Sequence, residues 1–313
     1  MKLLNKKILI IGGTGFVGRH VLARLAKEKA DITIASRTAE SNLELKVSGN
    51  LGKITLKNVN IEDKSTLEKI VSEHEIVINC LGILYERKRN QFAEYHAKFP
   101  EFLGRICKEH NIKSLIHISA LGVDKICNSK YASSKHKGEE AILAQFPETV
   151  ILRPSVVFGT EDNFFNQFAQ MTNISPFLPL IAGGRTKFQP IYVGDVAQAI
   201  FKILDNDIKA EIFELGGADI LTFRQILEFI LKTTQKNRIL LPLPLPIASL
   251  IARFTEIFAP QILTKDQVAL LKNDNITQEK AKTLYHLNIQ PKNIEDIVPK
   301  YLAKYSNNCY YKQ

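Results

Sequence analysis

Residues 7–20 of the chain read KILIIGGTGFVGRH. The four consecutive aliphatic residues 8–11 predict a strand that is buried on both faces, as in a parallel sheet. Gly12, Gly15 and Gly18 follow at fixed spacing, and apolar residues recur behind them with helical spacing. A glycine turn between a strand and a helix is the setting in which a GxxGxxG pattern indicates dinucleotide binding, because the N–H groups at the helix start can meet a pyrophosphate.

Each glycine of this turn has its own expected role. Gly12 permits the tight turn, Gly15 lets the backbone approach a pyrophosphate, and Gly18 lets the helix pack closely on the strand. The side chains between the glycines are expected to contact the same nucleotide: Thr14, Phe16 and Val17.

The composition is that of an ordinary globular protein, with 313 residues, 45% hydrophobic residues and 24% charged residues. A formal net charge of +10 favours anionic partners, which include nucleotides and acidic membrane surfaces. Nucleic acid is not an expected partner, because no basic run carries interleaved aromatic residues. None of the four cysteines forms a CxxC pair or a metal-ligand spacing, so we expect reduced thiols, an intracellular location and no metal site.

A second strand is expected at residues 32–35, and it ends at Ser36 and Arg37. An acidic residue at this position would bind the ribose 2′-OH of NAD, whereas an arginine accommodates a 2′-phosphate. The sequence therefore favours NADP(H) over NAD(H). The alternative is that Arg37 is a solvated surface side chain.

Two further strands are expected to bring residues to the nucleotide. Residues 54–59 lead to Asn60 and Ile61, which are placed near the adenine, and Ser65 is expected to cap the next helix. Residues 76–80 lead to Leu81 and Gly82, where the chain turns past the cofactor ribose.

A fifth strand at residues 115–118 ends at Ser119, and Tyr131 and Lys135 follow it at i and i+4 on one helix face. A lysine ammonium beside a phenol favours the phenolate, so Tyr131 could exchange a proton during hydride transfer. Lys135 could also hold ribose hydroxyls. No histidine falls in a catalytic or metal-binding pattern.

Taken together, these motifs resemble the short-chain dehydrogenase/reductase superfamily in its extended or atypical branch. The matching pieces are GGTGFVG, Ser36–Arg37, the Tyr131/Lys135 pair, RPSVVFG at 153–159 and IYVGDVA at 191–197. The resemblance implies an α/β fold with a Rossmann-type, doubly wound parallel sheet and a smaller C-terminal lobe. It also implies that Pro154 lies beside the nicotinamide.

The same resemblance implies a division of the chain. We expect residues 1–160 to form the NAD(P)-binding core and residues 187–218 to return to it. The smaller lobe is then formed by residues 161–186 and 219–313.

A narrower resemblance is to the nucleotide-binding accessory subunits of respiratory complex I (NADH:ubiquinone oxidoreductase) and their bacterial relatives. It rests on YASSKHKGEE at 131–140, on residues 164–166 and on KFQPIYVGDV at 187–196. It implies a tightly held, structural NADPH and docking on other complex I subunits beside the membrane. The expected location is then cytoplasmic and peripheral on the inner membrane, on the matrix side in a mitochondrion.

One departure from the superfamily bears on catalysis. Active members carry a Ser or Thr close behind the fifth strand, whereas Ser119 lies two residues early and Leu121 takes that position. The intact Tyr131/Lys135 pair keeps a second function open, that of a soluble NADP-dependent oxidoreductase, epimerase or dehydratase acting on a sugar-nucleotide or isoprenoid-like carbonyl.

Residues 239–259 combine closely spaced prolines with an apolar helical stripe. The prolines predict an extended path. The stripe then has two interpretations: an amphipathic helix that meets an anionic membrane or a partner, or a helix that completes the core of the smaller lobe. It comprises Ile247, Leu250, Ile251, Phe254, Ile257 and Phe258.

Overall fold

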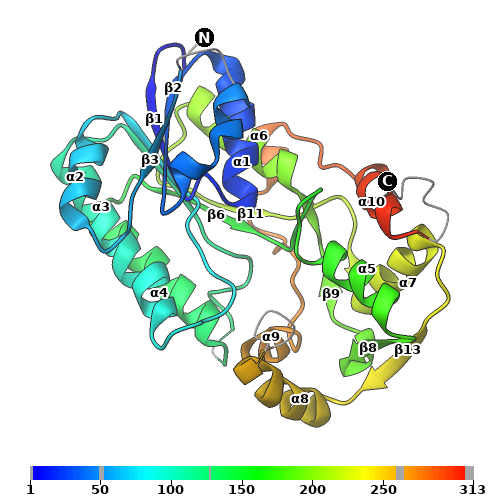
Figure 1. The fold of residues 1–313 in the computed structure, drawn as a ribbon. Helices are drawn as coiled ribbons and strands as arrows, with labels where there is room; N and C mark the ends of the chain where they lie inside the picture. Colours follow the sequence, from blue (N-terminus) through cyan, green and yellow to red (C-terminus); the bar gives the residue numbers. More distant parts are fainter. Residues whose placement is uncertain (1–2, 49–52, 127, 259–263, 307–313) are drawn as a thin grey trace.

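The computed structural model describes residues 3–48, 53–126, 128–258 and 264–306 (Figure 1). A parallel seven-stranded sheet forms the larger part, in the order β11-β6-β5-β4-β1-β2-β3. Its strands are β1 Lys7–Ile11, β2 Asp31–Ser36, β3 Ile54–Asn58, β4 Ile76–Asn79, β5 Ser114–Ile118, β6 Val150–Pro154 and β11 Ile212–Leu215. The predicted Rossmann-type fold class is therefore confirmed.

Helices cover both faces of this sheet. They are α1 Phe16–Leu25, α2 Lys64–Ser72, α3 Phe99–Glu109, α4 Lys130–Gln145 and α6 Val193–Asp205. Along β1, Ile8 and Ile10 pack in one core with α1 and α6, while Leu9 and Ile11 pack in a second core with α2, α3 and α4. The uninterrupted aliphatic run is thus explained by burial on two sides.

The strand order reverses at β1, since β2 and β3 extend the sheet on one side and β4, β5 and β6 extend it on the other. In open α/β sheets, ligands bind at the carboxyl ends of the strands beside such a reversal. The glycine turn and the residues after β4 both lie at this point, because β1 and β4 pair in parallel from Ile8 to Ile11.

A smaller lobe lies to the right of the sheet and below it in Figure 1 and has its own apolar core. Its elements are β8 Phe177–Ile181 paired with β13 Ile239–Leu243, β9 Lys187–Phe188 paired with β12 Leu221–Thr222, and helices α5 Phe165–Ile174, α7 Phe223–Thr234, α8 Leu245–Phe258, α9 Lys265–Leu270 and α10 Ile294–Leu302. Two further short strands, β7 Val157–Phe158 and β10 Ile191–Tyr192, pair with each other. One segment departs from the expected division, because Leu284, Leu287 and Ile289 pack in the same core as α1 and α6.

Helix α2 begins differently from the sequence expectation. Asp63, and not Ser65, is its N-cap, and the Asp63 carboxylate accepts a hydrogen bond from the Thr66 N–H at 3.1 Å. Ser65 lies inside the first turn and donates its hydroxyl to Asp63. These hydrogen bonds lower the pKa of Asp63. A carboxylate is favoured here because it meets the positive end of the helix dipole.

The extended path predicted for the proline-rich segment is confirmed for residues 239–243, where β13 pairs in parallel with β8. It is wrong beyond them, because α8 begins at Leu245 and includes Pro246 in its first turn. In α8, Ala248 and Ala252 are fully buried, whereas Ile247, Leu250 and Ile251 are 50%, 57% and 41% exposed. For these three residues, the interpretation that the stripe completes the lobe's core is wrong. The small alanines face inward and leave the larger side chains outside. The rest of the stripe, Phe254, Ile257 and Phe258, lies outside the described side chains.

Within the described residues, no helix is long and apolar enough to span a bilayer.

Candidate nucleotide-binding site

The glycine turn has the close backbone packing that a pyrophosphate site requires. Gly12 adopts φ +77°, and a Cβ placed on it would lie 3.1 Å from the Leu81 nitrogen. A Cβ on Gly18 would lie 2.5 Å from the Gly12 oxygen and 2.6 Å from the Gly13 Cα. Helix α1 therefore packs directly on the turn, and Gly15 is its N-cap. The N–H groups of the first helical turn have no partner inside the helix, which suits them to bind an anion.

The end of β2 carries polar groups and no carboxylate of its own. The Thr14 hydroxyl donates to the Ser36 hydroxyl at 3.0 Å, which joins the glycine turn to this strand end. Arg37 is exposed, and no hydrogen bond or ion pair engages it within the described part of the chain. The guanidinium is therefore free to meet an anion.

The residues predicted around the rest of the nucleotide lie in two groups. Asn79 accepts the Leu81 N–H at 3.1 Å, and a Cβ on Gly82 would lie 3.3 Å from the Lys135 ammonium nitrogen. The loop after β4 thus lies against α4. Ile61 packs at the edge of the second core, while Asn60 is exposed.

Three other predicted residues lie near strand ends. Pro154 ends β6, and its carbonyl accepts the Leu121 N–H at 2.9 Å. A Cβ on Gly159 would lie 3.1 Å from the Phe16 ring, so Phe16 packs beside the chain that follows β7. Val17 is partly buried against the core under α1.

Tyr131 and Lys135 both lie on α4 as expected, but their electrostatics differ from the expectation. The Lys135 ammonium donates to the Ile118 carbonyl at 2.9 Å, and burial lowers its pKa to about 8. Burial and the negative charge of Asp266 raise the pKa of Tyr131 to about 12. In this structure the ammonium is directed at a carbonyl, and the stabilisation of a Tyr131 phenolate by Lys135 stays a prediction.

Asp266 is a site residue that the sequence did not reveal. Its carboxylate accepts the Lys130 N–H at 2.6 Å, the Tyr131 N–H at 3.1 Å and the Ser129 hydroxyl at 2.8 Å. Helix α9 of the smaller lobe thus closes the N-terminus of α4, and the two lie together at the bottom of Figure 1. A contact between residues so far apart in sequence leaves no local signal.

The two residues considered for the catalytic hydroxyl position, Ser119 and Leu121, are both buried. Ser119 is 4% exposed, its hydroxyl has no hydrogen-bond partner, and no hydrogen bond joins it to Tyr131 within the described residues. Leu121 is buried, and its carbonyl accepts the Asn275 side-chain amide at 3.1 Å. The Ser155 hydroxyl donates to the Asn275 side-chain oxygen at 2.6 Å.

His96 joins the loop after β4 to α4. Its Nε2 accepts the Ile83 N–H at 3.1 Å, so its Nδ1 carries the proton and donates to the Ser134 hydroxyl at 3.0 Å. Burial, assisted by the charge of Lys135, lowers the pKa of His96 to about 2 and keeps the ring neutral. His96 lies in the π-helix Ala93–Lys98, and π-helical turns are frequent at functional sites. No sequence pattern predicted a role for His96.

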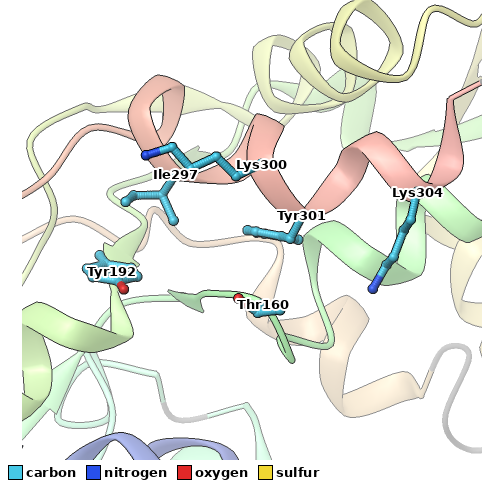
Figure 2. A pocket seen from close by; sticks show the side chains of 6 residues that line it. All are labelled: Thr160, Tyr192, Ile297, Lys300, Tyr301 and Lys304. Carbon is cyan, nitrogen blue, oxygen red and sulfur yellow. The ribbon is translucent and has the colours of Figure 1, made fainter. Parts of the chain in front are cut away.

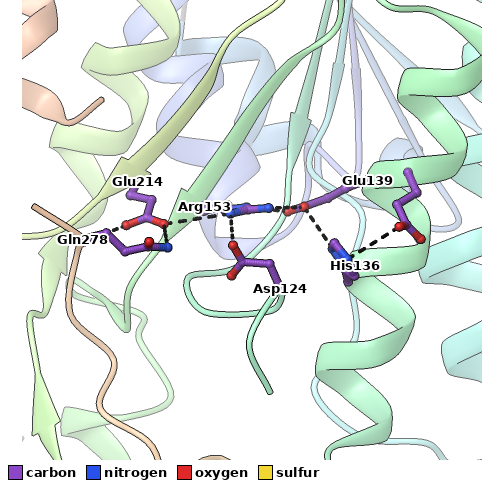
Figure 3. A network of polar contacts seen from close by, with 7 residues as sticks. Asp124, His136, Glu139, Arg153, Glu214 and Gln278 are labelled. Atoms are coloured by element: carbon purple, nitrogen blue, oxygen red, sulfur yellow. Dashed lines mark hydrogen bonds and ion pairs between the residues drawn. The ribbon is translucent and has the colours of Figure 1, made fainter. Parts of the chain in front are cut away.

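A buried ionic network lies beside the same strand ends (Figure 3). Arg153 donates to both carboxylate oxygens of Glu139 at 3.0 and 2.7 Å and to Asp124 at 2.8 Å. Its guanidinium also lies 3.9 Å from Glu214, which accepts two hydrogen bonds from Gln278. The network joins β6, α4, β11 and the chain after α9.

A cavity of about 510 Å³ lies elsewhere, under α10 (Figure 2). None of its lining residues belongs to the predicted nucleotide site: Thr160, Tyr192, Ile297, Lys300, Tyr301 and Lys304. Within the described residues, no group of three or more His, Cys, Asp or Glu side chains could hold a metal ion.

Replacing Lys135 by Met is expected to stabilise the nucleotide-free protein below pH 8. The pKa of Lys135 falls from 10.5 to about 8 on folding, so the unfolded chain binds more protons between these values. Lys135 therefore makes the stability of the fold rise with pH between about 8 and 10.5. Below pH 8, burying the charged lysine lowers the free energy of unfolding by about 3 kcal/mol. Urea unfolding at pH 7 and pH 10 measures the difference between variant and wild type.

Lys137→Met, at an exposed position of the same helix, is the control and should change stability little at either pH. An equal effect of Lys135→Met at both pH values would contradict the expected linkage.

The chain is similar to known proteins over most of its length. Residues 8–216 match the model of the NAD dependent epimerase/dehydratase family. The chain is 31% identical over 309 residues to the mitochondrial NADH dehydrogenase [ubiquinone] 1 alpha subcomplex subunit 9 of Arabidopsis thaliana, which covers 95% of this chain and 77% of the relative. It is 29% identical to the mitochondrial NADH-ubiquinone oxidoreductase 40 kDa subunit of Neurospora crassa, with 96% and 80% covered.

Solved structures show the same fold. A dTDP-glucose 4,6-dehydratase from Bacillus anthracis in complex with NAD has a TM-score of 0.73, with 18% identity and 96% of both chains covered. A UDP-glucose 4-epimerase from Thermotoga maritima has a TM-score of 0.72, with 18% identity and 95% and 99% covered. A nicotinamide dinucleotide is the cofactor class of the matching family. The chain therefore belongs to the NAD dependent epimerase/dehydratase family and, within it, to the group of the NADH dehydrogenase alpha subcomplex subunit 9 proteins.

Proposed function

We propose that this protein is an NADP(H)-binding accessory subunit of a respiratory NADH:ubiquinone oxidoreductase, and that its nucleotide is structural and is not turned over. The similarity to complex I subunits over nearly the whole chain supports the assembly. The observation that supports the structural role is the burial of Ser119 and Leu121, together with a Ser119 hydroxyl that makes no hydrogen bond to Tyr131 within the described residues.

The nucleotide fits the residues that are present. Peptide N–H groups of the glycine turn would bind the pyrophosphate, and Lys135 would hold ribose hydroxyls. A bound nicotinamide could accept or donate hydride, but a carbonyl substrate needs a hydroxyl donor and an acidic group beside it. The high pKa of Tyr131 and the absence of a hydroxyl at Leu121 both disfavour that reaction.

Purification of the native protein from detergent-solubilised membranes tests this function. We expect it to co-purify with NADH:ubiquinone oxidoreductase, to retain NADPH through gel filtration, and to retain it equally in the Tyr131→Phe variant. A soluble protein that oxidises NADPH with a carbonyl substrate, and loses that activity in Tyr131→Phe, would favour the oxidoreductase, epimerase or dehydratase function instead.

Arg37→Asp is expected to reverse the cofactor preference. The change removes a charge-assisted contact worth about 1.5–3 kcal/mol and places a carboxylate where the 2′-phosphate would lie. We therefore expect NADPH affinity to fall by at least about tenfold and NADH affinity to stay or rise. Calorimetric titration with both nucleotides measures the ratio.

Arg89→Asp is the control for Arg37→Asp, because it changes the net charge equally on an exposed segment after β4. An unchanged preference in Arg37→Asp would leave Arg37 as a solvated surface residue.

We also propose that the smaller lobe rests on an anionic membrane beside the partner subunits, at the inner membrane and on the matrix side in a mitochondrion. Half of the exposed large hydrophobic side chains in the described structure gather on α5, β8, β13 and α8. They are Ile174, Phe177, Ile239, Leu241, Ile247, Leu250 and Ile251. Arg185 and Arg253 are exposed near the same elements, so apolar burial and charge attraction would act together.

Sedimentation with phospholipid vesicles tests this contact. Binding is expected to require phosphatidylserine and to weaken about tenfold in Leu250→Glu, because one buried Leu side chain contributes about 1.5–3 kcal/mol. The matched control is Ile220→Glu, because Ile220 is also exposed but lies outside these four elements. Equal binding by Leu250→Glu and wild type would contradict the proposed membrane contact.

A further inference from the structure

The glycine turn and the chain after β2 are joined by a ring of hydrogen bonds. Arg19 donates its Nε to the Thr14 carbonyl at 2.8 Å and its Nη2 to the Asn42 side-chain oxygen at 2.6 Å. The Asn42 amide in turn donates to the Thr38 carbonyl at 2.6 Å. Because the Thr14 hydroxyl donates to Ser36, the ring returns to the end of β2.

This ring places a second guanidinium beside the predicted 2′-phosphate position. Thr14 and Ser36 mark that position, because they join the glycine turn to the strand end where the ribose lies in this fold. The Arg19 guanidinium is hydrogen-bonded to Thr14 on one side and to Asn42 on the other, so its orientation is already fixed before any anion binds. A pre-organised guanidinium loses little conformational entropy when it binds an anion.

The remaining face of Arg19 is available for a stronger partner than it now has. Its Nη1 lies 3.4 Å from a Glu44 carboxylate oxygen, and the two side chains are 39% and 58% exposed. An exposed ion pair of this kind contributes about 0–1 kcal/mol. A phosphate dianion, which guanidinium binds through paired hydrogen bonds, can displace it.

We propose that Arg19 is a second 2′-phosphate ligand, which forms with Arg37 a two-arginine clamp that selects NADPH over NADH, and that Glu44 competes with the phosphate for Arg19. This inference rests on the proposed NADP(H) binding and adds to it a residue that determines specificity. Arg19 lies on α1 directly after Gly18, so the glycine motif and the selectivity would be joined in one helix turn.

Calorimetric titration of the full-length protein with NADPH and with NADH tests the clamp in two variants, one expected to weaken NADPH binding and one expected to strengthen it. Arg19→Gln should raise the NADPH dissociation constant about tenfold through the loss of a charge-assisted contact, and should leave that of NADH within about twofold. Glu44→Gln should lower the NADPH dissociation constant about twofold to threefold by removing the competitor, and should leave NADH unchanged.

Arg105→Gln, an exposed arginine of α3 with the same charge change, is the control and should alter neither constant. If Arg19→Gln weakens both nucleotides equally, Arg19 only supports the turn and the clamp is overturned. If Arg19→Gln does not fold, Glu44→Gln decides alone, because an unchanged or weaker NADPH affinity there also overturns it.

The two proposals fail in different ways. A wild-type protein that binds neither nucleotide, or prefers NADH, would refute the proposed function and the clamp with it. A wild-type protein that prefers NADPH, together with an Arg19→Gln variant that keeps the full preference, would refute the clamp alone.

Discussion

Arg153→Met is expected to lower the free energy of unfolding by about 3–5 kcal/mol, which is the cost of breaking a buried ion pair by removing one partner. The Glu139 and Glu214 side chains are 3% and 4% exposed, and the variant removes the arginine that faces both of them. Glu214 would keep its hydrogen bonds from Gln278, whereas Glu139 would lose its bidentate partner. Urea unfolding followed by circular dichroism measures the change.

Arg105→Gln is the control for this experiment too, because it breaks an exposed Arg105–Glu109 pair of the same chemistry. It should cost less than about 1 kcal/mol. A comparable loss in the two variants would mean that the buried network contributes no more than a surface pair. A double variant that also replaces Glu139 by Leu should recover part of the loss, since no uncompensated charge then remains in the pair.

The second large effect is expected from Gly18→Ala, which should reduce NADPH affinity at least about a hundredfold and destabilise the fold by about 1–3 kcal/mol. The added methyl would meet backbone atoms of Gly12 and Gly13 at 2.5 and 2.6 Å. Backbone cannot rotate away as a flexible side chain can, so the turn and α1 must separate. The N–H groups at the helix start would then leave their positions for a pyrophosphate.

Ala23→Val adds more volume on the exposed side of the same helix and is the matched control. It should retain NADPH binding within about twofold, because it touches neither the turn nor the core. Thermal unfolding with and without NADPH distinguishes a lost site from a lost fold. A Gly18→Ala variant that binds NADPH as tightly as wild type would contradict the close packing of turn and helix.

The Rossmann-type sheet could be predicted because its evidence is local. An aliphatic run followed by spaced glycines describes one strand, one turn and one helix, and the structure has them at Lys7–Ile11 and Phe16–Leu25. The shared helix of Tyr131 and Lys135 was predicted for the same reason, since i and i+4 lie on one face.

What the sequence did not reveal depends on contacts between distant segments. Asp266 at the N-terminus of α4 and Asn275 against Leu121 come from the smaller lobe, and no spacing rule joins residues so far apart. The direction of the Lys135 ammonium, and with it the pKa of Tyr131, also depends on tertiary packing. The apolar stripe of α8 shows a further limit, because periodicity identifies an amphipathic helix but not which neighbour covers it.

We propose above all that the glycine turn of residues 12–18 holds a nicotinamide dinucleotide and that the end of β2 selects the 2′-phosphate. Calorimetric titration of the full-length protein, freed of bound nucleotide, with NADPH and then with NADH tests it most directly. We expect one binding site per chain, which binds NADPH more tightly than NADH and is lost in Gly18→Ala. The proposed nucleotide site would be contradicted if neither nucleotide gave a heat of binding and neither shifted the unfolding temperature.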